Sequence, residues 1–155
     1  DEKWTSSWAS ALADESKPMA DRLAAFYEGY GADPENLRLR LFLRGSLDGW
    51  PLPARIGPIV AKSLVIPVIA DLRNQEGLPD LSVRAMMAGE RELVMLLHGA
   101  VVEHYVRLRV HNLASPDTTA VTNLYIDAFL RAARSSLRGL HDGKGDESLR
   151  QTAAP

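Results

Sequence analysis

The sequence predicts an all-α protein, and three observations lead to that fold class. Apolar residues recur at helical spacing along most of the 155-residue chain. Glycine and proline residues separate these periodic stretches, as they do at residues 48–53. Residues 90–140 carry more apolar surface than one small domain can bury. We therefore expect a multi-helix bundle that dimerises through its last two helices, with a domain at residues 1–141 and a disordered tail at residues 142–155.

The first half of the chain predicts four helices, which span about residues 2–13, 17–31, 35–48 and 54–76. Two prolines fall in the last of them. Pro58 is expected in its first turn, where proline costs no hydrogen bond. Pro67 is expected to kink the helix, because proline removes one backbone hydrogen bond and crowds the preceding turn.

The second half predicts an irregular stretch at residues 78–88, followed by helices at residues 90–111 and 116–140. In the turn between these two helices, Ser115 is expected to cap the second one and Pro116 to take its first helical position.

The two last helices each present more than one apolar face. An ordinary surface helix needs a single apolar stripe. The helix at 90–111 has two, one through Val94, Leu97 and Val101 and one through Met95, Gly99 and Val102. The second stripe predicts a packing partner outside the domain, and the simplest partner is a second copy of the chain. The residues expected at this dimer interface are Val102, Val106, Thr122, Ile126, Phe129, Ala133 and Leu137.

The composition of the chain excludes several classes of function. The 18 Lys and Arg residues against 20 Asp and Glu residues give a net charge of −2, which argues against nucleic-acid binding by this chain alone. The absence of cysteine excludes thiol nucleophiles, disulfides and thiolate metal sites, and it agrees with a cytoplasmic protein. No apolar run is long enough for a membrane span, and no signal peptide is visible.

The sequence lacks the common catalytic motifs. The sequence has no glycine-rich nucleotide loop, no nucleophile elbow and no zinc-protease motif. His104 and His111 share a helix face, but two turns separate them by roughly 10 Å, too far for one metal ion. We therefore expect no enzyme activity, no metal site and no cofactor.

Several phrases of the sequence resemble those of a known family. GERELVMLLHGAVVEHY at residues 89–105 and YIDAFLR at residues 125–131 look like the dimer helices of TetR/AcrR-type bacterial transcriptional regulators. LDGWPLPAR at residues 47–55 and VIPVIADLR at residues 65–73 are similar to the loop and long helix that precede them. DEKW at residues 1–4 resembles the start of the helix that links the DNA-binding head to the body.

The resemblance implies the effector-binding and dimerisation body of such a regulator, whose N-terminal helix-turn-helix is absent from this chain. DNA would then be a partner only through that missing domain. The effector would be a small apolar or amphipathic molecule, held between helices in a mostly apolar pocket with a few polar groups. The residues expected to contact it are Tyr27, Tyr30, Phe42, Ser46, Trp50, Met86, Met87, Met95 and His98.

Two other readings remain open at the level of sequence. The chain could be a helical protein–protein dimerisation module with no ligand, since the same aromatic and methionine residues can simply fill a core. It could also be a helical-bundle enzyme, which would call for a repeated Glu-x-x-His pattern that the sequence lacks.

Overall fold

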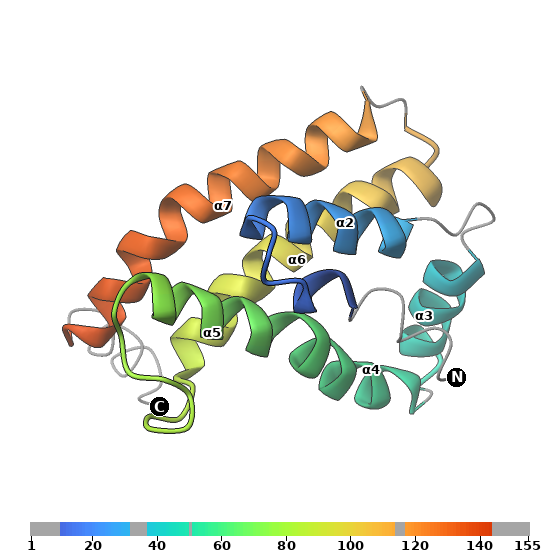
Figure 1. Ribbon diagram of the computed structural model, residues 1–155. Helices are drawn as coiled ribbons and strands as arrows, with labels where there is room; N and C mark the ends of the chain where they lie inside the picture. Colours follow the sequence, from blue (N-terminus) through green and yellow to red (C-terminus); the bar gives the residue numbers. More distant parts are fainter. Residues whose placement is uncertain (1–9, 32–36, 50, 114–116, 144–155) are drawn as a thin grey trace.

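The computed structural model describes residues 10–31, 37–49, 51–113 and 117–143, and every regular element in these ranges is a helix (Figure 1). The all-α prediction is confirmed. After a helical turn at residues 10–13, the elements are α2 (Met19–Gly31), α3 (Leu37–Leu47), α4 (Leu52–Val60), the π-helix η1 (Ala61–Val65), α5 (Ile66–Gln75), α6 (Ala88–Arg109) and α7 (Thr118–His141). Residues 144–155 of the expected tail lie outside the described residues. No helix in the described ranges combines the length and the apolar character needed to cross a membrane.

The two longest helices, α6 and α7, form an antiparallel pair (Figure 1). At one end, Gly89 near the start of α6 meets Leu140 near the end of α7. At the other end, Arg107 of α6 donates a hydrogen bond to the Tyr125 hydroxyl of α7, at 3.2 Å. Helix α2 also packs against α7, so α7 is covered by two helices of its own chain.

The core lies where α2, η1, α5, α6 and α7 meet. Its side chains come from the apolar stripe of each helix and are almost completely removed from water. They include Leu23, Phe26, Tyr27, Leu64, Val68, Ile69, Leu72, Val94, Leu97, Val101, Ile126 and Leu137. This burial is the main stabilising contribution in a fold of this size.

The structure corrects part of the expected dimer interface. Thr122, Ile126, Ala133 and Leu137 are buried within a single chain, so their side chains belong to its own core. Helical periodicity identifies an apolar face but not the neighbour that covers it, and here α2 and α6 cover this face of α7. Of the other expected residues, Val102, Val106 and Phe129 are only partly buried.

Helices α4, η1 and α5 follow one another without a break, and the π-helix η1 ends two residues before Pro67, where a kink was expected. The Ile66 N–H bonds to the Ala61 carbonyl, five residues earlier, directly before Pro67. The proline ring would crowd the carbonyl four residues before it in a regular α-helix, and a wider turn relieves that crowding. Pro58 lies inside α4 rather than in its first turn, because the helix begins at Leu52.

Acidic side chains accept backbone N–H groups at the start of each of the last two helices. The Glu90 carboxylate accepts the Met87 N–H at the start of α6, at 2.7 Å. Asp117 is the N-cap of α7, and its carboxylate accepts the Thr119 N–H at 2.9 Å. Ser115 and Pro116, the expected cap and first helical residue, lie outside the described residues. Side-chain acceptors here satisfy N–H groups that have no partner within the helix.

Candidate functional site: an aromatic pair and a buried ionic cluster

Two of the residues expected at the effector site meet between α2 and α6. The rings of Tyr27 and His98 are stacked, with centroids 6.1 Å apart and an interplanar angle of 26°. Phe26 meets Tyr27 edge to face, with centroids 5.1 Å apart. On α6, Met95 lies one turn before His98 and packs against the same core. The structure therefore brings an aromatic ring and an imidazole together inside the bundle.

The surroundings of His98 favour its neutral form. Burial lowers the pKa of the His98 imidazole from 6.5 to about 4. A neutral imidazole has one N–H donor and one acceptor nitrogen. At neutral pH this site therefore presents an uncharged polar group among apolar side chains.

Tyr105 joins α6 to the same part of α2. Its hydroxyl donates to the Tyr27 carbonyl at 3.3 Å, about two turns along α6 from His98. Burial raises the pKa of Tyr105, against the opposing effects of a hydrogen bond with Thr122 and the charge of Arg109. Tyr105 is thus a buried, uncharged link between the two helices, and it was not among the expected site residues.

Of the remaining expected residues, the structure describes the side chains of Met86, Met87 and Ser46, and the two methionines lie away from His98. Met87 is the N-cap of α6, so roughly 16 Å of helix separates it from His98. Met86 is next to it and packs against the core from that end. Ser46 is exposed on α3. The side chains of Tyr30 and Phe42, and the whole of Trp50, lie outside the described residues.

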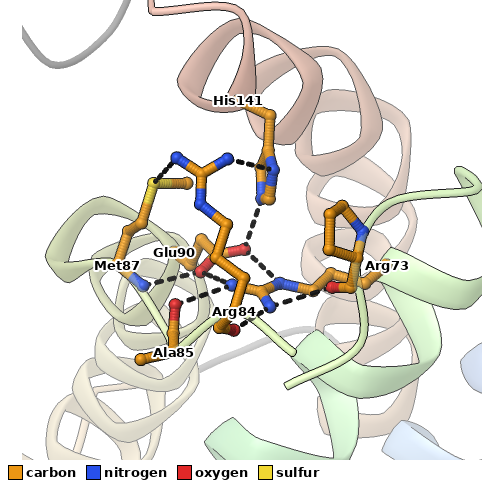
Figure 2. Close-up of polar contacts among 7 residues, drawn as sticks. Arg73, Arg84, Ala85, Met87, Glu90 and His141 are labelled. Carbon is orange, nitrogen blue, oxygen red and sulfur yellow. Dashed lines mark hydrogen bonds and ion pairs between the residues drawn. The ribbon is translucent and has the colours of Figure 1, made fainter. Parts of the chain in front are cut away.

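A buried ion pair that sequence reasoning missed lies at the start of α6. Arg73 of α5 and Glu90 of α6 pair through two parallel contacts, Nε to Oε1 at 2.7 Å and Nη2 to Oε2 at 2.6 Å (Figure 2). Their side chains are 1% and 0% exposed. A buried charge is stable only when it is paired and hydrogen-bonded, and this bidentate geometry meets that requirement.

The same Arg73 guanidinium holds the segment between α5 and α6. Its Nη1 donates to the carbonyls of Pro79 at 3.0 Å and Arg84 at 2.6 Å, and its Nη2 donates to the carbonyl of Ala85 at 3.2 Å. With the two contacts to Glu90, all five N–H donors of a guanidinium are engaged. Arg73 therefore fixes the path of residues 79–85 over the end of α5.

His141, the last residue of α7, completes the cluster. Its Nε2 lies 3.0 Å from Glu90 Oε1, and its Nδ1 lies 3.4 Å from Arg84 Nη1 (Figure 2). Burial alone would raise the pKa of Glu90, but hydrogen bonds from Arg73, His141 and the Met87 N–H lower it to about 2. Glu90 is therefore ionised at every physiological pH.

The sequence does contain signals for this cluster. Arg73 continues the apolar stripe of Val68, Ile69 and Leu72, and a cation in an apolar stripe demands a buried partner. Glu90 lies in the first turn of α6, where a carboxylate caps the helix. The pairing itself joins positions 17 and 51 residues apart, which local patterns do not reveal.

Helices α6 and α7 each carry a strip of uncharged residues that are exposed or half-buried, and we call the two strips together the outer face. Leu96 is 70% exposed and Leu124 is 60% exposed, although both are large apolar residues. At helical spacing beside them lie mostly small residues that are exposed or half-buried. The outer face comprises Leu93, Leu96 and Ala100 of α6 and Val121, Leu124, Ala128, Ala132, Ser135 and Gly139 of α7.

The chain was compared with known proteins. No family model matches it, and searches of curated proteins and of solved structures found no match. Among the described residues, no group of three or more His, Cys, Asp or Glu side chains could hold a metal ion. The aromatic pair, the ionic cluster and the outer face are therefore the features from which function is inferred.

Proposed function

We propose that this chain is the effector-sensing and dimerisation body of a TetR-like transcriptional regulator, acting in the cytoplasm by binding rather than by catalysis. The observation that carries the proposal is the outer face of α6 and α7. An exposed apolar strip on a soluble helix pair marks an interaction site. Its position on the last two helices coincides with the segments whose sequence resembles the dimer helices of that family.

A second copy of the chain is the partner that fits this face. Two-fold symmetry brings the same strip of each subunit together, so the strip must be complementary to itself. A face without charge avoids setting like charges against each other across the axis. The alanines at 128 and 132 and Gly139 let helices approach closely, while Leu96 and Leu124 supply apolar area. The proposed product is a four-helix bundle formed by α6 and α7 of both subunits.

The proposed effector site lies between α2 and α6, beside Tyr27 and His98. In this proposal an apolar molecule lies against the aromatic ring and forms one hydrogen bond with the neutral imidazole. A molecule that binds one arrangement of α2 and α6 better than another would shift the dimer toward that arrangement. In the intact regulator, that shift would alter the spacing of two DNA-reading heads, which must match about one turn of DNA.

A thermal-shift screen of uncharged, flat, hydrophobic molecules tests the effector proposal. A molecule that binds only the folded state raises the melting temperature, by an amount set by its concentration relative to Kd. We expect at least one stabiliser, and we expect His98→Leu to abolish its effect. The matched control is His111→Leu, which alters an exposed histidine after α6 and should leave the effect intact. If broad screening gives no stabiliser, a dimerisation module without a ligand becomes the better account.

A further inference from the structure

Arg22 of α2 contacts two other parts of the chain at once. Its Nη1 donates to the Leu12 carbonyl at 3.1 Å, and its Nη2 lies 3.0 Å from Asp71 Oδ1 of α5. Leu12 belongs to the helical turn at residues 10–13, and the last carbonyls of a helix have no donor within it. One guanidinium therefore joins this turn, α2 and α5. We call these three residues the Arg22 link.

Burial makes the two contacts of Arg22 depend on each other. The Arg22 side chain is 5% exposed and that of Asp71 is 20% exposed. A cation in such surroundings is stable only beside an anion, and Asp71 supplies it. Without Asp71 the guanidinium has to move toward water, and it then takes its N–H donor away from the Leu12 carbonyl. Asp71 thus controls a bond in which it takes no part.

Arg22 is held less completely than the buried Arg73. All five N–H donors of Arg73 are engaged. Within the part of the chain that the structure describes, the buried Nε of Arg22 has no hydrogen-bond partner. A buried donor without an acceptor carries a desolvation penalty, and that penalty disappears when the group reaches water. The Arg22 link can therefore open while the contacts of Arg73 stay closed.

The Asp71 carboxylate also belongs to a set of contacts on the surface. Its Oδ2 accepts from Gln75 Nε2 at 2.6 Å, and Gln75 Oε1 accepts from Arg134 of α7 at 3.0 Å. Both contacts are exposed, so water can replace either partner at little cost. The buried pair with Arg22, and not this surface extension, decides whether the turn stays bound.

We propose that the Arg22 link is a releasable attachment of the turn at residues 10–13 to α5. While Arg22 is paired with Asp71, the turn is docked; when α5 moves away from α2, the pair separates and the turn is released. In the proposed regulator, this docking would set the direction in which the chain enters the domain from the DNA-binding head. That consequence rests on the proposed function, whereas the link itself does not.

Paired spin labels measure the docking of the turn in the full chain. The sequence has no cysteine, so Ala13→Cys and Glu92→Cys provide two unique labelling sites, both exposed and the second on α6. Dilution into unlabelled chain keeps the measured distances within one subunit. Double electron–electron resonance should give a single narrow distance distribution in this labelled parent. A broad distribution in the parent would overturn the proposal, because the turn would not be docked.

Two variants and a control identify what holds the turn. Asp71→Ala removes only the anion, and it should add a second population at a different distance. Arg22→Met removes the donor itself and leaves no buried cation, so it should fold and show the same second population. Gln75→Ala removes the exposed neighbour of Asp71 and should keep the distribution of the parent.

The outcomes separate this proposal from the proposed function. An unchanged distribution in Arg22→Met, or in an Asp71→Ala variant with a helical circular dichroism spectrum, would show that the apolar Leu12 side chain holds the turn alone. A second population in Gln75→Ala equal to that in Asp71→Ala would overturn the role of the buried pair. None of these distances depends on an effector or on dimerisation, which the thermal-shift screen and sedimentation test.

Discussion

Arg73 and Glu90 form a bidentate ion pair whose two side chains are 1% and 0% exposed, and this pair joins α5 to α6. It is also the centre of the contacts that hold residues 79–85. Removing Arg73 therefore leaves the Glu90 charge buried and also removes the bonds that hold this segment.

Substituting either member of the pair should destabilise the fold strongly. Arg73→Met leaves the Glu90 carboxylate buried without its cation, which typically costs about 3–5 kcal/mol. Urea unfolding measures this loss. The matched control is Arg44→Met, which breaks an exposed pair with Asp48 whose side chains are 76% and 43% exposed. We expect at most about 1 kcal/mol there, and equal losses in the two variants would contradict the role of the buried pair.

The low pKa of Glu90 predicts an acid-dependent loss of stability. Its folded value of about 2 is below the ordinary 4.5, so its contribution is complete above pH 4.5 and is lost as the pH falls toward 2. Glutamine does not titrate, so Glu90→Gln should weaken the dependence of the free energy of unfolding on pH below pH 4.5. The free energy of unfolding, measured by urea titration at pH 5 and pH 3, should therefore change less in Glu90→Gln than in the parent. A parallel decline in both proteins would exclude Glu90 as its cause.

His98 predicts a second acid response in a different pH window. Its pKa is about 4 in the fold and 6.5 ordinarily, so the unfolded chain binds the proton more readily. The contribution of the neutral His98 ring to the free energy of unfolding is then complete above pH 6.5. It declines by on the order of 3 kcal/mol as the pH falls toward 4. His98→Leu should remove most of this decline between pH 7.5 and pH 4.5 in urea unfolding. His111→Leu serves as the control, and an undiminished decline in His98→Leu would count against burial of a neutral ring.

Two glycines of α6 should respond differently to alanine. A Cβ at Gly89 would lie 2.7 Å from Cδ2 of Leu140, whereas a Cβ at Gly99 would meet nothing within 4 Å. Alanine is favoured over glycine inside a helix by about 1 kcal/mol. We expect Gly99→Ala to stabilise the chain by about that amount in urea unfolding. Gly89→Ala should gain less or lose stability, because Leu140 must move, and equal gains would show that α6 and α7 are not in close contact there.

Local patterns were enough to predict the helices. The all-α class and the two long terminal helices follow from periodicity, and the structure bears them out. A kink was expected at Pro67, and the structure has a π-helix directly before it. The predicted first residues of the helices were less accurate than the helices themselves. The helix α7 begins at Thr118 with Asp117 as its N-cap, whereas a start at residue 116 was expected, because serine and aspartate are both good capping residues.

Contacts between helices were harder to predict than the helices. Tyr27 and His98 were both expected at the effector site and do meet, but Met86 and Met87 lie at the start of α6. Ile126 and Leu137 were assigned to an interface because periodicity shows an apolar face without naming its neighbour. The Arg73–Glu90–His141 cluster was missed because its members come from three helices.

The most direct test of the proposed function is the oligomeric state of an outer-face variant. Sedimentation velocity of the parent chain should show a dimer. Leu124→Arg would place two charges against each other at the two-fold contact, so it should sediment as a folded monomer with an unchanged helical circular dichroism spectrum. Leu47→Arg alters an even more exposed leucine, 89% against 60%, on α3 and should remain dimeric. A monomeric parent, or a Leu124→Arg variant that stays dimeric, would contradict dimerisation through the outer face of α6 and α7.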